Sequence, residues 1–78
     1  MTKPNETLDA RGLSCPMPIV KSMQAIKKIK VGQVLEILTT DPGSRNDIPV
    51  WAKATKQELL SFEELGPGRF RFLVKRLK

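Results

Sequence analysis

The sequence contains no histidine, no tyrosine and a single cysteine, Cys15. One thiol cannot form a disulfide within the chain, and a secreted domain of this size would ordinarily carry several. Zinc sites are built from clusters of cysteine and histidine, so this composition disfavours a metal site. The lack of histidine also excludes a Cys–His pair for acyl transfer. Three roles remain for Cys15: an inert core residue, an intermolecular disulfide, or a nucleophile that carries a chemical group.

Long apolar stretches are also missing. No run approaches the roughly 20 residues needed to span a bilayer. The first residues, MTKPNET, lack the apolar segment of a secretory signal. We therefore expect a cytoplasmic protein without membrane contacts. The 78 residues are 40% hydrophobic and 28% charged, which predicts one folded domain over 1–78, with residues 1–5 flexible.

The charge balance is one-sided, with a formal net charge of +6. Such a surface favours acidic proteins or nucleic acid as partners, although solvated lysines alone also explain it. Only 5% of the residues are aromatic, which disfavours recognition of nucleic acid by base stacking.

The first half of the chain predicts a strand, a helix and a second strand. ETLDA, Glu6–Ala10, has the composition of a short strand. From Pro16 to Lys30, ending near Gly32, apolar residues recur at helical spacing and predict one buried stripe: Ile19, Val20, Met23, Ile26 and Ile29. QVLEILTT, residues 33–40, is β-branched and largely apolar and predicts a central strand.

A second helix is expected after the turn sequence DPGSRNDIP. Ser44 and Asp47 fit a capping pattern, whereas Pro49 favours a start nearer Asp47, and both starts stay open. The helix is expected to run to about Leu60, and its buried face is listed from the spacing as Ile48, Trp51, Ala52, Thr55 and Leu59.

The end of the chain predicts a hairpin. SFEEL and RFRFLVKRL flank Gly66-Pro67-Gly68, a turn signal. Phe70, Phe72 and Val74 alternate with charged residues, while Leu73 and Leu77 fall on the charged face. The order βαβαββ predicts the α/β class: a two-layer α/β sandwich with two helices on one face of a mixed four-stranded sheet.

The setting of the thiol is unusual for a structural residue. With Cys15 as N-cap, Pro16 falls at N1 and Pro18 at N3, where missing N–H groups cost no helix bond. Cysteine is a poor cap, but a helix N-terminus lowers thiol pKa values. Since prolines donate no hydrogen bond, Met17 N–H is expected to be the main free amide near the sulfur.

Two blocks of the sequence resemble a known family. LDARGLSCPMP (8–18) carries a Cys-Pro-x-Pro motif after the first strand, and TTDPGSRNDIPVWA (39–52) follows the second strand. Together they resemble the TusA/SirA family of small sulfur-carrier proteins, over nearly the whole chain from Leu8 to Val74.

The resemblance implies a role for each motif residue. Cys15 would accept a sulfane sulfur as a persulfide, and no other cofactor is implied. Pro16 and Pro18 would fix the helix entrance, with the variable Met17 between them. Gly12 would let the loop approach closely. Asp41 and Asp47 would lie near the cysteine or in a docking surface.

Two charged neighbours of the motif leave a question open. Arg11 would raise the positive potential near Cys15, and Asp9 would oppose it if it lies close. The sequence does not decide between them.

The resemblance also implies partners and a broad enzymatic role, that of a sulfurtransferase acting stoichiometrically between proteins. Cysteine desulfurases or rhodanese-like proteins would donate sulfur, and DsrE-type proteins would accept it. The pathways served are tRNA thiolation, molybdenum cofactor supply and sulfur oxidation. Two alternatives stay open: a basic RNA-binding module with Arg69, Arg71 and Lys75 on a sheet face, and a redox-sensing regulator acting through an intermolecular disulfide.

Overall fold

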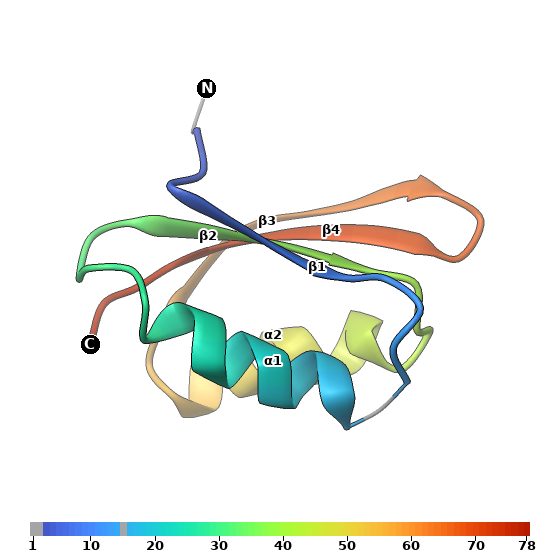
Figure 1. Cartoon of the computed structure of the whole chain (residues 1–78), viewed down its shortest axis with the longest axis horizontal. Helices are drawn as coiled ribbons and strands as arrows, with labels where there is room; N and C mark the ends of the chain where they lie inside the picture. Colours follow the sequence, from blue (N-terminus) through green and yellow to red (C-terminus); the bar gives the residue numbers. More distant parts are fainter. Residues whose placement is uncertain (1–2, 15) are drawn as a thin grey trace.

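The computed structural model describes residues 3–14 and 16–78. The elements are β1 (Glu6–Ala10), α1 (Met17–Ile26), β2 (Val34–Thr39), α2 (Ser44–Ala54), β3 (Glu58–Gly66) and β4 (Arg69–Lys75). The four strands form one sheet in the order β1-β2-β4-β3. β1 pairs parallel to β2, and the other two pairs are antiparallel. Both helices lie on one face of this mixed sheet, which confirms the predicted fold class (Figure 1).

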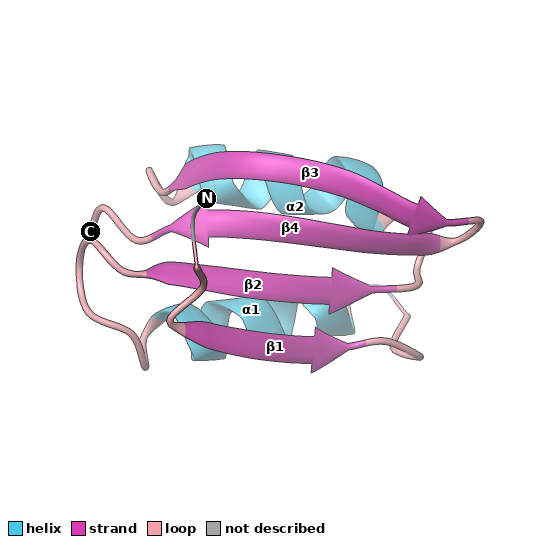
Figure 2. Ribbon diagram, turned by 90° about the horizontal axis from the view of Figure 1, so that it is seen from above, coloured by secondary structure: helices cyan, strands magenta, loops and turns pink. Residues whose placement is uncertain are grey.

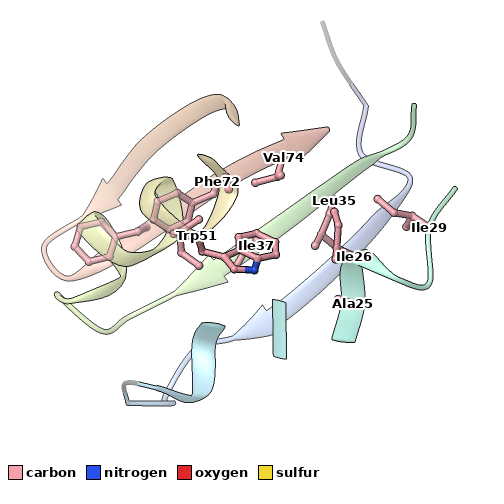
Figure 3. Packing of buried hydrophobic residues seen from close by; sticks show 11 residues of the cluster. Ala25, Ile26, Ile29, Leu35, Ile37, Trp51, Phe72 and Val74 are labelled. Atoms are coloured by element: carbon pink, nitrogen blue, oxygen red, sulfur yellow. The ribbon is translucent and has the colours of Figure 1, made fainter. Parts of the chain in front are cut away.

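Each helix covers one half of the sheet. α1 contacts β1 and β2, while α2 contacts β3 and β4 (Figure 2). The core between the layers takes Leu35 and Ile37 from β2 and Phe72 and Val74 from β4, all fully buried. Ala25, Ile26, Ile48 and Trp51 close it from the helices (Figure 3). The alternation predicted for β4 is thus confirmed, and Trp51 is a core residue.

α1 begins one residue later than predicted. Its N-cap is Pro16, not Cys15, so Met17 is N1 and Pro18 is N2. Both prolines precede Val20, whose N–H donates to Pro16 O at the start of the helix. Their spacing therefore excludes a helix that starts earlier than predicted, but it permits the later start that is observed.

The end and the buried face of α1 also differ from the prediction. The helix stops at Ile26, and the chain continues in tighter turns as Lys28 N donates to Ala25 O at 3.0 Å. Val20 and Met23 are 36% and 46% exposed, contrary to the predicted stripe. The buried face instead runs through Pro18, Ser22, Ala25 and Ile26.

α2 begins at Ser44, the earlier of the two starts that the sequence left open, and Pro49 lies inside the helix. The prediction that it runs to Leu60 is wrong, because the chain reverses at Lys56 (φ 61°). Lys56 N donates to Lys53 O at 3.1 Å and Gln57 N to Ala52 O at 2.8 Å, the two bonds of a Schellman motif. A lysine thus takes the left-handed position usually held by glycine, and residues 58–60 belong to β3.

On the sheet face turned away from the helices, one polar residue from each strand contributes to a connected row: Thr7, Glu36, Arg71 and Glu63. Thr7 Oγ1 donates to Glu36 Oε1 at 2.9 Å. Arg71 pairs with Glu36 through Nε and with Glu63 through Nη1, the latter at 3.2 Å. The Arg71 guanidinium lowers the pKa of Glu36. Leu73 is buried on this same face, 6% exposed.

The hairpin strand β3 is irregular. Its register against β4 shifts twice, between Leu59 and Ser61 and between Glu64 and Gly66. The predicted turn follows, with Gly68 at φ 71°. The shifts leave Phe62 on the helix side, where its ring lies 5.1 Å from that of Phe72.

Candidate functional site

Two loops meet at one edge of the sheet. Because β1 and β2 are parallel, residues 11–14 and residues 40–43 leave the sheet at the same edge (Figure 2). Gly12 N donates to Thr40 Oγ1 at 2.8 Å. This bond ties the loop that carries the Cys-Pro-x-Pro motif to the second motif block. Cys15 itself lies outside the described residues, so its predicted role stays a prediction.

Gly12 is required for its conformation. Its φ is +82°, and a Cβ built there would meet nothing within 4 Å. No atom of the described residues therefore requires the lack of a side chain at Gly12, and the expectation that Gly12 permits a close approach stays a prediction. The loop needs a residue that adopts the left-handed region at low cost.

Asp9 and Arg11 form an ion pair on the surface of this edge. Arg11 Nε donates to Asp9 Oδ1 at 2.8 Å and Nη2 to Oδ2 at 2.9 Å. These bonds lower the pKa of Asp9 to about 2 and raise the pKa of Arg11. Each charge therefore offsets much of the other, and the effect of the pair on Cys15, which lies outside the described residues, stays a prediction.

The entrance of α1 is held by backbone bonds. Met17 N donates to Ser14 O at 2.8 Å, and Val20 N donates to Pro16 O at 3.1 Å. The expectation that Met17 N–H is a free amide is therefore wrong, because the turn before the helix uses it. Pro16 is exposed, whereas Pro18 is buried on the inner face of the first turn of α1, so Pro18 anchors the entrance against the sheet.

Asp41 and Asp47 lie on either side of Gly43. A methyl group built at Gly43 would lie 3.1 Å from Asp41 Oδ2 and 3.6 Å from Asp47 Oδ2. Asp41 Oδ2 is buried and has no hydrogen-bond partner among the described residues. The structure thus brings the two predicted carboxylates close together, Asp41 in the loop that joins β2 to α2 and Asp47 in the first turn of α2.

A buried hydroxyl pair fixes this second loop. Ser44 Oγ lies 2.6 Å from Thr39 Oγ1 and donates to Asp41 O at 2.6 Å. The sequence suggests Ser44 only as a helix cap and gives no local signal for Thr40, which holds Gly12. The bond from Gly12 to Thr40 joins residues 28 positions apart, and the contact between Ser44 and Thr39 depends on burial, so no local pattern marks either.

The central cation of the sheet face is neutralised by its acidic neighbours. Arg71, the central cation of the predicted face, is paired with Glu36 and Glu63. The rings of Phe62, Phe70 and Phe72 cluster with one another, and Phe70 and Phe72 are buried in the core under the helices. These features give no support to the RNA-binding alternative.

Within residues 3–14 and 16–78, no helix is both long and apolar enough to cross a bilayer.

The fold is that of a two-layer α/β protein. A hydrogen bond from Gly12 to Thr40 holds the loop that leads into the Cys-Pro-x-Pro motif beside the loop that carries Asp41. Residues 6–76 match the family model described as "Sulfurtransferase TusA". The chain belongs to the TusA family, which confirms the resemblance, and a sulfur-carrier role follows from this membership.

Two similar proteins and one solved structure illustrate the relationship. The sulfur carrier protein TusA of Allochromatium vinosum is 43% identical over 72 residues, which are 92% of this chain and 93% of that protein. YrkF of Bacillus subtilis is 49% identical over 75 residues, 96% of this chain, but the chain spans only 40% of its length. A SirA-like protein from Desulfitobacterium hafniense has the same fold, with a TM-score of 0.80 at 22% identity over 94% of this chain and 99% of that one.

Proposed function

We propose that Cys15 carries sulfane sulfur as a persulfide between a donor and an acceptor protein. The observation that carries this proposal is the lone cysteine of the chain, set between a loop pinned at Gly12 and a helix entrance fixed by Pro18. A carrier needs a single thiol, because a second would resolve the persulfide into a disulfide. It also needs that thiol on a rigid support.

Each transfer balances without an external oxidant. The Cys15 thiolate attacks the outer sulfur of a donor persulfide, and a new S–S bond forms as the donor S–S bond breaks. The donor leaves as a thiolate, and one sulfur atom has moved. The second transfer repeats these steps with the acceptor thiolate as nucleophile, so the protein needs no general base of its own.

The surface beside the motif supports docking of partner proteins. Met17, Val20 and Met23 are exposed along α1, at 38%, 36% and 46%, and the net charge of +6 favours acidic partners. We infer a cysteine desulfurase or a rhodanese-like protein as donor and a DsrE-type protein as acceptor.

Intact mass under non-reducing conditions tests the proposal. The protein is incubated with a cysteine desulfurase and cysteine, and separately with a rhodanese and thiosulfate. We expect a gain of one sulfur atom that a reductant removes. Cys15→Ser should gain none, while the neighbouring exposed Ser14→Ala should load as the unaltered chain does.

Two other results of the mass measurement would count against the proposal. A disulfide-linked dimer in place of the sulfur adduct would favour the redox-sensing alternative. An unchanged mass with both donors, while Cys15 still reacts with an alkylating agent, would overturn the proposal.

Docking is tested by a matched pair of charge insertions. Val20→Glu places a carboxylate on the proposed strip, and Val50→Glu places one on α2, where Val50 is 66% exposed. We expect slower sulfur loading for Val20→Glu alone. Equal rates for the two variants would show that the α1 strip does not contact the donor.

A further inference from the structure

The chain leaves β1 through a tight turn of residues 10–13. Leu13 N donates to Ala10 O at 3.3 Å, and Gly12, the third residue of the turn, has φ +82°. A type II turn has both features, because its third residue must adopt a positive φ. The hydrogen bond that closes such a turn uses the N–H of the fourth residue. The N–H of Gly12 therefore needs an acceptor outside the turn.

The hydroxyl of Thr40 is that acceptor. Gly12 N donates to Thr40 Oγ1 at 2.8 Å, and Thr40 directly follows the last residue of β2. The other bonds of the turn are local, since Arg11 N donates to Asp9 Oδ1 at 3.1 Å. Apart from the pairing of the strands, the bond to Thr40 is the hydrogen bond, among the described residues, that ties this turn to the neighbouring part of the sheet.

Thr40 is itself held on both sides. Its neighbour Thr39 is fully buried, and Thr39 Oγ1 lies 2.6 Å from Ser44 Oγ. On the other side, Asp41 O accepts from Ser44 Oγ at 2.6 Å and from Ser44 N at 3.0 Å. The first residue of α2 thus fixes the chain before and after Thr40. Threonine also has few rotamers about its first side-chain bond, so the hydroxyl of Thr40 is a rigid acceptor.

We propose that Thr40 is a positioning residue for sulfur transfer, an inference that rests on the proposed function. Its hydroxyl holds the turn of residues 10–13, and this turn sets the direction in which the chain continues to Cys15, two residues after Leu13. A docked partner presents its sulfur atom from one direction, so the orientation of the motif loop decides how often the two sulfur atoms meet in the geometry that exchange requires. Thr40 takes no proton and forms no bond in the transfer itself.

Three variants separate positioning from stability. Thr40→Val keeps the shape of the side chain and removes the acceptor, whereas Thr40→Ser keeps a hydroxyl. Thr7→Val is the matched control, because Thr7 Oγ1 donates to Glu36 Oε1 at 2.9 Å, another exposed side-chain bond across the pair of β1 and β2. We expect Thr40→Val and Thr7→Val to have similar midpoints in urea unfolding.

The rate of sulfur loading is then measured against donor concentration, with the donor that loads the unaltered chain. Thr40→Val should lower the maximal rate about twofold to tenfold, the factor expected for loss of one hydrogen bond. The half-saturating donor concentration should stay the same, because the exposed strip of α1 is unaltered. Thr40→Ser should recover most of the maximal rate, and Thr7→Val should load as the unaltered chain does.

Alkylation of Cys15 by iodoacetamide reports the thiol without a partner protein. Its rate and pH dependence should be the same in Thr40→Val and in the unaltered chain, because a small reagent approaches from many directions. A merely destabilised fold would not give this combination of slower loading and unchanged alkylation.

Three results would overturn the inference. Equal maximal rates for Thr40→Val and the unaltered chain would show that the hydroxyl does not position the motif loop. A parallel fall in loading and alkylation would show that Thr40 acts on the reactivity of the thiol. A change confined to the half-saturating donor concentration would show that Thr40 acts on docking. All three leave the proposed function standing, whereas an unaltered chain that gains no sulfur would overturn the proposed function and this inference with it.

Discussion

Gly12 offers a clean test of how backbone conformation supports the motif loop. Its φ of +82° lies in the left-handed region, and a Cβ there would meet no atom within 4 Å. Gly12→Ala therefore adds no steric clash, and its whole cost is the conformational preference of alanine. That preference disfavours left-handed backbone by about 1–2 kcal/mol. For a domain of this size, the loss lowers the melting temperature by about 4–16 °C.

The assay combines thermal or urea unfolding with the rate of sulfur loading. Gly12→Asn should recover much of the stability, because asparagine tolerates the left-handed region. Gly32→Ala is the matched control: Gly32 has φ +93° and equally open surroundings, but lies in the turn between α1 and β2. It should lose similar stability and keep the loading rate, whereas Gly12→Ala should slow loading.

The reasoning would be refuted if Gly12→Ala were as stable as the unaltered chain. It would be refuted in its functional part if Gly12→Ala and Gly32→Ala loaded sulfur at the same rate.

Three further substitutions follow from the structure. Lys56→Gly should stabilise the fold by about 1 kcal/mol in urea unfolding, because glycine suits the left-handed Schellman position; a loss of stability would contradict this. Ser44→Ala should cost about 1–3 kcal/mol, since it leaves the buried Thr39 hydroxyl without its partner, and a neutral result would show that this pair contributes nothing. Arg71 lowers the pKa of Glu36, so the stability from this pair is present above the ordinary carboxyl range and is lost as pH falls below it. Glu36→Gln should reduce the loss of stability that the protein shows at low pH. An unchanged loss would refute the assignment of that loss to the pair of Glu36 and Arg71.

The sequence predicted most of the architecture because its local signals agreed. Glu6–Ala10 is the predicted first strand, and the Gly66-Pro67-Gly68 turn joins the predicted hairpin. The errors arose where packing overrode a local pattern. Val20 and Met23 have the spacing of a buried face, but α1 buries Ser22 and Ala25 instead, and Val20 and Met23 stay exposed.

The end of α2 shows a second limit. Leu59 fits the helical period of Ile48 and Ala52, and the stop signal is a lysine rather than a glycine, so nothing local marked the reversal. At the site, the residues of both motif blocks were predicted, and Asp41 and Asp47 do lie on either side of Gly43, one in the loop and one in the first turn of α2. The bond from Gly12 to Thr40 was not predictable, because it joins loops whose proximity depends on the parallel pairing of β1 and β2.

The irregular register of β3 has a consequence for encounters between copies of the chain. β3 is an outer strand of the sheet, with one side unpaired, and a long straight edge invites another molecule to add a strand there. The two register shifts interrupt the row of backbone donors and acceptors, and the acidic side chains Glu58, Glu63 and Glu64 stand along the same strand. Edge-to-edge pairing of two copies through β3 is thereby disfavoured, which discourages fibre growth.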